Sequence, residues 1–401
     1  MSTELTTTRN HSFDTFRGLL MISIPIWHFS KCAGDWYSDL YQANFSHSSI
    51  LGFVYLLLNI FVMQGFAFIS GYFSKNPEKA KTKAFSDALV PYIMFTVVAI
   101  ILELITGQNV SNDEPFLKPT FALWFLLCLF IWKITLPYVT KFKWALPVSI
   151  GVMLFAGMMP FHTFLSLQRM ISFYPFFLLG FYCKKEWVEK IRNLRKHPTL
   201  LIGIISLLLI INFILLKVGP SFEWYHLSKN TDILNISAGY DISMRFIMLI
   251  LACSWISVIL ALIPKRETGL SIIGKNTMPI YVFHIIFRQL LRFSGLYVCS
   301  LFIIIAAVFS YFSYMYNKTK NKGYVIAEMA IMTMSIILFI NSNYNFMDTF
   351  VPENKIALYI MVYGSAFLLS VTLIAPCWKK LYETIVFKKR LSEILNPNIS
   401  Y

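Results

Sequence analysis

Residues 13–32 read FDTFRGLLMISIPIWHFSKC, a run long enough to cross a bilayer as one helix, although it carries Asp14, Arg17 and His28. In an α-helix, the eleven residues from Arg17 to His28 make three turns plus about 20°, so both side chains share one stripe, ~16 Å apart along the axis. Ionisable side chains at membrane depth are costly unless they face protein or water. We therefore expect Arg17 and His28 to mark the two ends of an active-site channel. Taken alone, each residue also fits a simpler interpretation: an interfacial anchor for Arg17 and a packing histidine for His28.

The composition of the whole chain agrees with a membrane location. Of its 401 residues, 57% are hydrophobic and 14% are charged, whereas a soluble domain has about 25% charged residues. The sequence predicts an all-α, polytopic integral membrane bundle of about 10–12 transmembrane helices, forming a single domain over residues 1–401 of a multi-pass cell-membrane protein. The apolar runs fall near 13–32, 50–73, 88–106, 120–138, 144–159, 163–183, 199–217, 243–263, 276–293, 297–316, 324–341 and 356–378.

The formal net charge of +15 reflects topology. Of the 35 Lys and Arg residues, 24 lie in the segments expected on one side of the membrane and six in those expected on the other. Basic residues concentrate in cytoplasmic connections, so this distribution predicts that both termini are cytoplasmic. It also argues against nucleic acid as a partner.

Two connecting segments carry more than turn residues. Residues 218–242 form the longest expected external segment, polar and aromatic, and long enough for a lid or a sugar-contacting loop. Residues 184–198 (KKEWVEKIRNLRKHP) fit an interfacial amphipathic helix whose charge suits anionic lipid or a phosphorylated ligand, although topology alone also explains that charge. The six cysteines are scattered without any CxxC or Cys/His cluster, so neither a metal site nor a disulfide framework is expected.

Several other ionisable residues fall inside apolar runs. Asp14 precedes Arg17 by three residues, so the two can pair on one helix face. Glu103 lies near the outer end of its run and either reaches the interface or touches substrate. Arg169 lies in a run that we expect Pro175 to break, and irregular backbone at that depth is tolerated where it lines a cavity or is buried in protein. Arg245 is expected at the outer mouth of its run.

A second constellation is NTMPIYVFHIIFRQLLRF, residues 276–293. His284, Arg288 and Arg292 follow one another at intervals of four, which places them on one stripe of a helix. They suggest a polar vestibule leading outward, or one buried histidine and two interfacial arginines. Tyr281 adds a hydrogen-bonding group on the inner half of this run.

Five motifs in order resemble the membrane acyltransferase-3 family. The first is the basic residue and histidine separated by ten residues, Arg17 and His28. The others are GFAFISGYFSK (65–75), LWFLL (123–127), YPFFLLGFY (174–182) and KNTMPIYVFH (275–284). The resemblance covers about residues 9–290, and FISGYFSK is similar to the branch of fucose 4-O-acetylases and capsular or exopolysaccharide O-acetyltransferases. Residues 297–378 are then additional C-terminal helices.

The resemblance implies an O-acetyltransferase that uses acetyl-CoA as co-substrate, with no metal. The acceptor would be a sugar hydroxyl of an envelope polysaccharide or a lipid-linked glycan. An unperturbed imidazole titrates near 6.5, so His28 suits a general base, either directly or through an acyl-histidine. Arg17, held by Asp14, would bind coenzyme A phosphate or polarise the carbonyl.

Further residues are assigned by the same resemblance. Ser70 is a small residue at which the donor could approach the helix closely. Tight packing between helices explains a small residue there equally well. Lys81 and Lys83 stand where members of the family often carry paired arginines. Trp124 would line the sugar site that the resemblance implies. The other residues expected to contact the acceptor are the polar side chains within apolar runs named above: Glu103, Arg169, Tyr281, His284 and Arg288.

Two other functions fit the sequence. A non-enzymatic exporter of glycans or lipid-linked oligosaccharides would also have buried arginines and aromatic walls, although no internal repeat is visible. An acyltransferase acting on a small molecule or a membrane lipid is the other alternative. The sequence leaves the oligomeric state open.

Overall fold

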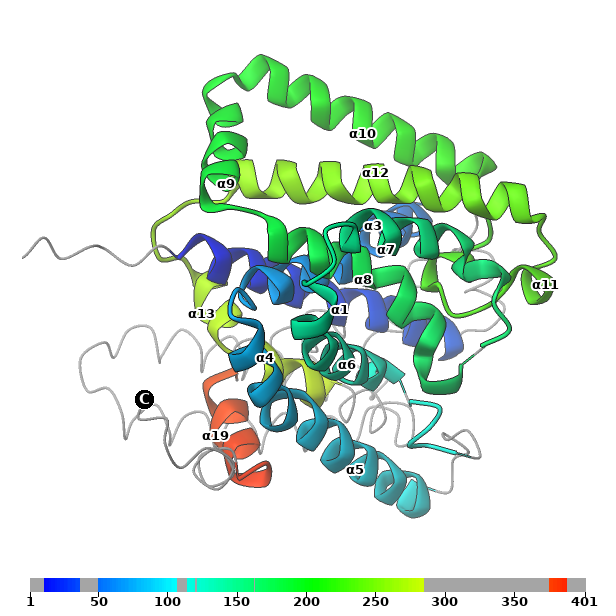
Figure 1. The fold of residues 1–401 in the computed structure, drawn as a ribbon, viewed down its shortest axis with the longest axis vertical. Coiled ribbons are helices and arrows are strands. Elements are labelled where there is room, and N and C mark those ends of the chain that lie inside the picture. Colours follow the sequence, from blue (N-terminus) through cyan, green and yellow to red (C-terminus); the bar gives the residue numbers. More distant parts are fainter. Residues whose placement is uncertain are drawn as a thin grey trace, which may run out of the picture.

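The computed structural model describes residues 11–36, 50–106, 114–119, 121–161, 163–284 and 375–387, which form helices and contain no strand (Figure 1). In chain order, the longer helices are α1 (Ser12–Trp36), α3 (Ile50–Tyr72), α4 (Pro77–Ala84), α5 (Val90–Thr106), α6 (Trp124–Val139), α7 (Ala145–Phe155), α8 (Leu167–Tyr182), α9 (Lys185–Arg192), α10 (Pro198–Val218), α12 (Ala238–Leu262), α13 (Gly269–Lys275) and α19 (Ala375–Ile385). Short elements are the π-helical turn η1 (Phe85–Leu89), the 3₁₀ turns η2 (Phe121–Leu123), η3 (Ala156–Met158), η4 (Phe164–Ser166), η5 (Asn193–Lys196) and η6 (Trp224–His226), and the single α-turn α11 (Thr231–Leu234).

Five helices in the described part are long and apolar enough to cross a membrane: 52–72, 77–105, 164–182, 198–218 and 238–262. α6 and α7 are shorter apolar helices. The predicted multi-pass helical membrane fold is therefore confirmed. The predicted runs 297–316 and 324–341, most of 356–378, and both termini lie outside the described residues, so the total of 10–12 helices and the cytoplasmic termini stay predictions.

The basic connections gather at one end of the bundle, which we call the basic end. Lys265, after α12, contacts Glu189 of α9 with its Nζ 2.9 Å from Oε2, and its carbonyl accepts a hydrogen bond from the His11 amide at the start of α1. The hydrogen bond from Lys265 lowers the pKa of the Glu189 carboxyl. The predicted amphipathic helix is present here as α9, with Val188 buried and Trp187 exposed. The opposite end carries residues 219–237, the 219–237 loop, which includes η6 and α11 (Figure 1).

Two glycine crossings hold the helices that carry the candidate site. A Cβ on Gly71 of α3 would overlap the carbonyl of Phe177 in α8, and a Cβ on Gly180 of α8 would overlap the carbonyl of Phe68. Gly18 of α1 and α13 meet in the same way. Only glycine permits such backbone approaches, so α3 and α8 are held in close contact at Gly71, next to Ser70 in the sequence.

Pro175 does not break its helix, contrary to the expectation from the sequence. α8 continues from Leu167 to Tyr182 with Pro175 inside it. A proline removes one helical hydrogen bond, and transmembrane helices tolerate this where neighbouring helices pack closely, as α3 and α7 do here. The irregular backbone lies just before the helix, where Leu165 and Ser166 have φ of 47° and 50°.

Candidate active site

A cavity of about 330 Å³ opens at the basic end, and we call it the basic cavity. Its walls come from α1, α3, the α3–α4 connection, α4, η1 and α6. The described lining residues are Arg17, Ser70, Phe73, Ser74, Asn76, Lys79, Ala80, Lys83, Asp87 and Lys133. Four of them are cations and one is an acid, so this lining suits an anionic ligand.

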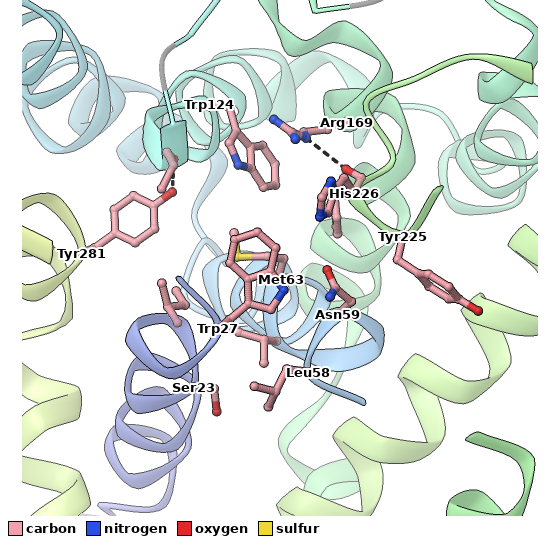
Figure 2. Close-up of a pocket in the computed structure, with 14 residues that line it drawn as sticks. Ser23, Trp27, Leu58, Asn59, Met63, Trp124, Arg169, Tyr225, His226 and Tyr281 are labelled. Atoms are coloured by element: carbon pink, nitrogen blue, oxygen red, sulfur yellow. Dashed lines mark hydrogen bonds between the residues drawn. The ribbon is translucent and has the colours of Figure 1, made fainter. Parts of the chain in front are cut away.

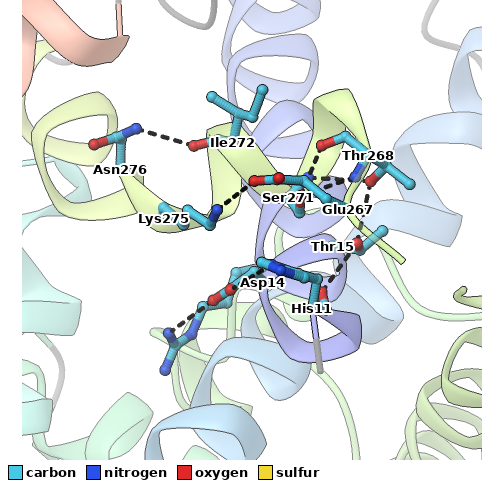
Figure 3. Close-up of polar contacts among 10 residues, drawn as sticks. His11, Asp14, Thr15, Glu267, Thr268, Ser271, Ile272, Lys275 and Asn276 are labelled. Atoms are coloured by element: carbon cyan, nitrogen blue, oxygen red, sulfur yellow. Dashed lines mark hydrogen bonds and ion pairs between the residues drawn. The ribbon is translucent and has the colours of Figure 1, made fainter. Parts of the chain in front are cut away.

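Arg17 is fixed at the wall of the basic cavity by contacts on two sides. Its Nη1 lies 3.9 Å from Oδ1 of Asp14, which is the i, i+3 pair expected from the sequence, and its guanidinium lies 4.3 Å from the ring centre of Phe73. Asp14 is mostly buried and also lies 3.6 Å from the ring of His11 (Figure 3). Asp14 is not among the described lining residues, so it acts on the cavity through Arg17.

α13 packs along this part of α1. Thr268 caps α13 in a reciprocal capping box with Ser271, and the Thr268 hydroxyl lies 3.2 Å from the hydroxyl of Thr15 (Figure 3). The pairing fixes the turn of α1 that carries Asp14 and Arg17.

The start of α4 adds to the positive potential of the basic cavity. Asn76 caps the helix by accepting a hydrogen bond from the Lys79 amide at 3.0 Å, and Pro77 follows it. A helix N-terminus favours anions because its amides point outward and the helix dipole is positive there. Lys133 of α6 also lines this cavity, with its Nζ 3.9 Å from Oδ2 of Asp87 in η1.

The structure brings together three of the four residues expected at the donor. Arg17, Ser70 and Lys83 line the basic cavity, whereas Lys81 does not. The Lys81 Nζ donates to the hydroxyl of Tyr138 at 2.8 Å on the exposed surface. Lys81 and Lys83 are two residues apart, so they point to different sides of α4.

A second cavity of about 320 Å³, the aromatic cavity, lies farther along the bundle (Figure 2). It brings together Trp124, Arg169 and Tyr281, which the sequence assigned to the acceptor separately. The described lining residues are Ser23, Ile24, Trp27, Leu58, Asn59, Val62, Met63, Ala122, Trp124, Arg169, Phe173, Tyr225, His226 and Tyr281.

Arg169 and Tyr281 are oriented by backbone carbonyls. The Nε of Arg169 donates to the carbonyl of His226 at 3.0 Å, and its guanidinium lies 4.9 Å from the ring centre of Trp124. The hydroxyl of Tyr281 donates to the carbonyl of Ala122. Figure 2 shows the guanidinium between the Trp124 and His226 side chains.

The 219–237 loop supplies a site residue that the sequence did not single out, His226. Its Nε2 lies 2.6 Å from the hydroxyl of Tyr55, and its ring meets Trp27 edge to face at 5.5 Å. The polar, aromatic character of the loop had indicated a sugar-contacting role for the segment. It could not select His226, because that contact depends on how the loop folds back over α3.

The two cavities share three helices. α1 contributes Arg17 to the basic cavity and Trp27 to the aromatic cavity, and α6 contributes Lys133 and Trp124 in the same way. At 1.5 Å per residue, these pairs are separated by about 15 Å and about 14 Å along their helices. No described residue lines both cavities. The described part of the chain thus holds two cavities in series, whereas a channel joining Arg17 to His28 stays a prediction, because the side chain of His28 lies outside the described residues.

The chain matches the family model for an acyltransferase domain, Acyl_transf_3, over residues 10–309. The protein belongs to the acyltransferase-3 family. It is therefore an enzyme that transfers acyl groups and a multi-pass membrane protein, so the alternative of a non-enzymatic exporter is set aside. Comparisons with curated proteins and with solved structures give no match.

The remaining residues predicted for this acyltransferase are placed as follows. His28 lies in α1, one position after Trp27, and its side chain is outside the described residues, as is Arg288. His284 is fully buried, with Nδ1 3.3 Å from the carbonyl of Ile280, and it is not among the described residues of either cavity. Glu103 lies in α5, partly exposed, and lines neither of them.

Metal ligands do not cluster in the described part of this acyltransferase. It holds no group of three or more His, Cys, Asp or Glu side chains that could bind a metal ion. Its cysteines Cys128, Cys183 and Cys253 are free thiols. A reaction without a metal stays a prediction.

Proposed function

We propose that this acyltransferase moves an acetyl group from acetyl-CoA, bound at the basic end, to a sugar hydroxyl of a cell-envelope polysaccharide or lipid-linked glycan. One observation carries the proposal: a cavity lined with cations and a cavity lined with aromatic side chains lie in series on the same three helices. A donor with its charge at one end and its reacting group at the other fits this arrangement.

The basic cavity is suited to the phosphates of coenzyme A. Arg17 can bind a phosphate through two parallel N–H donors, and Lys79 and Lys83 add point charges beside it. The pantetheine arm of coenzyme A separates its phosphates from the thioester. With the phosphates held in the basic cavity, the extended arm directs the thioester toward the aromatic cavity. The position of Arg17 among lysines favours phosphate binding over carbonyl polarisation.

The reaction requires one proton acceptor near the thioester. The acceptor hydroxyl oxygen forms a bond to the acetyl carbon, the carbon–sulfur bond breaks, and the hydroxyl proton passes through a base to the departing thiolate. His28, beside Trp27 in sequence, is our candidate for that base. Transfer through an acyl-histidine needs the same residue.

The aromatic cavity is suited to a sugar. Trp27, Trp124 and Tyr281 offer flat apolar surfaces, and Asn59 and Ser23 offer hydrogen-bonding groups among them. Sites of this kind combine apolar walls with a few polar groups that fix orientation.

Product analysis with labelled acetyl-CoA tests the proposed function. Membranes containing the protein are given acetyl-CoA labelled in the acetyl group, and the label is followed into polysaccharide, lipid-linked glycan, lipid and soluble fractions. We expect it in the polysaccharide or lipid-linked glycan, as a base-labile ester. Label confined to simple lipids or to a soluble product would overturn the proposed acceptor. Absence of label from every fraction, with folded protein present in the membranes, would overturn acetyl-CoA as the donor.

Substitution of Lys83 by Gln is expected to raise the KM for acetyl-CoA about tenfold, because a charge-assisted contact to phosphate is lost. The matched control is Lys81→Gln, two residues away on the same helix, whose side chain contacts Tyr138 outside the basic cavity. We expect its KM to stay within about twofold of the unsubstituted protein. Equal effects of the two substitutions would contradict a donor site in the basic cavity.

A further inference from the structure

We propose that the acceptor carries an anionic group, a sugar carboxylate or a phosphate, which binds Arg169 in the aromatic cavity. The inference rests on the proposed function for the identity of the acceptor as a sugar. It adds the charge that the acceptor must have.

The first argument compares Arg169, on α8, with three cations on other long helices, α1, α6 and α12; Arg192, buried at the basic end on α9, is left aside because it donates to the carbonyl of Ile263. Arg17 lies beside Asp14, Lys133 beside Asp87, and Arg245 forms an ion pair with Asp241. Arg169 has no ion pair with any described carboxylate. A guanidinium at membrane depth is costly without a counter-ion, so an anionic ligand would stabilise it.

The second argument is the composition of the aromatic cavity. None of its described lining residues is Asp or Glu, and Arg169 is the one Lys or Arg among them. An anion entering this cavity therefore meets one cation and no acid on the described walls. A cationic acceptor would meet no carboxylate on these described walls.

The third argument concerns which nitrogens of Arg169 are occupied. The Nε donates to the carbonyl of His226, and the plane of the guanidinium is held near Trp124. Within the described part of the chain, the terminal nitrogens donate no hydrogen bond. Terminal guanidinium nitrogens match the two oxygens of a carboxylate or phosphate.

The phosphates of the donor are an unsuitable occupant for this position. They have four cations in the basic cavity, whereas Arg169 is in the first turn of α8, beside the 219–237 loop at the opposite end. The anion at Arg169 therefore belongs to the acceptor.

Ligand-induced thermal stabilisation of the purified full-length protein tests this inference without requiring turnover. The probes are methyl β-D-glucuronide, glucose 6-phosphate and the neutral methyl β-D-glucoside. We expect glucuronide, glucose 6-phosphate or both to reach half-maximal stabilisation at a concentration about tenfold lower than the glucoside. The two anionic probes distinguish a sugar acid from a phosphorylated sugar.

Variants then assign the preference to Arg169. In Arg169→Gln the preference should fall below about threefold, whereas Arg169→Lys should retain part of it. The control Lys229→Gln removes an exposed cation of the 219–237 loop that pairs with Glu223, and it should leave the preference unchanged. Because the comparison among probes is made first on the unsubstituted protein, an unstable Arg169→Gln variant does not prevent a result.

Three results would overturn the inference. They are equal stabilisation by all three probes, a preference that persists in Arg169→Gln, and a loss of turnover in Arg169→Gln that is equal for charged and neutral acceptors with binding unchanged. The last would assign Arg169 to the oxyanion of the transfer reaction. A charge preference in a protein that acetylates no glycan would overturn the sugar acceptor of the proposed function and leave standing only an anion-binding site at Arg169.

Discussion

Acetyl transfer is expected to fall by about 10²- to 10⁴-fold when His28 is replaced by Gln, the range that a positioned general base contributes. Gln keeps much of the size and polarity of the imidazole but cannot accept the hydroxyl proton at neutral pH. The phosphates of the donor bind elsewhere in our proposal, in the basic cavity with Arg17 and Lys83. The KM for acetyl-CoA should therefore change little while kcat collapses.

The measurement is initial-rate kinetics with labelled acetyl-CoA on purified protein, with His197→Gln as the matched control. His197 is exposed at the basic end, just before α10, and lines neither described cavity. A His28→Gln protein that keeps more than about a tenth of the rate would contradict a base at this position. His226→Gln is the informative companion, because that imidazole lies at the aromatic cavity beside Tyr55. Loss of turnover there, with His28→Gln active, would move the base to the 219–237 loop.

Contacts within one helix were predictable from the sequence. The i, i+3 spacing of Asp14 and Arg17 predicts their pairing, and the two side chains are found together. Separation along a helix is also fixed by residue number, which is why Arg17 could be assigned to one end of the bundle in advance. These relations depend on helix geometry alone.

Contacts between helices were not predictable, because they depend on packing. Nothing in the sequence states that Trp124, Arg169 and Tyr281 would line one cavity, although each was selected as polar or aromatic at membrane depth. Lys81 and Lys83 have the same charge and nearly the same position, yet the rotation of α4 turns only Lys83 toward the basic cavity. The sequence could not supply that rotation.

Arg245 has one contact that the sequence could predict, within its own helix, and others that it could not, from other segments. It was expected at the outer mouth of its span, but it is buried, with its Nε 2.7 Å from Oδ2 of Asp241 four residues earlier. The spacing was visible in the sequence. The other hydrogen-bond partners of this ion pair were not visible in the sequence, because they come from other segments. Trp224 of the 219–237 loop donates to Asp241 at 2.6 Å, and Arg245 donates to the hydroxyl of Ser172 in α8 at 2.8 Å.

Replacing Asp241 by Asn is expected to destabilise the protein by about 3–5 kcal/mol, because it leaves the buried Arg245 without a counter-charge. Both carboxylate oxygens of Asp241 accept hydrogen bonds, one from Trp224 and one from Arg245. An amide offers one acceptor oxygen, so one of these donors would face an NH₂ group. Thermal unfolding in detergent measures the loss. The control is Glu223→Gln, which breaks the exposed pair with Lys229 and should cost no more than about 1 kcal/mol.

The double substitution Asp241→Leu with Arg245→Met separates the unpaired charge from the packing of the same side chains. Removing both charges should recover stability relative to Asp241→Asn, because a buried charge without its partner costs more than an apolar pair of similar size.

The same variants also test whether the Asp241–Arg245 ion pair holds the 219–237 loop over the aromatic cavity. Trp224 is one of the buried residues of the 219–237 loop, and His226, whose carbonyl accepts a hydrogen bond from Arg169, follows it two positions later. Loss of the Trp224 contact should therefore raise the KM for the acceptor more than the KM for acetyl-CoA. Equal changes in the two KM values, or a Tm of Asp241→Asn equal to that of Glu223→Gln, would contradict a role for this ion pair in holding the loop over the aromatic cavity.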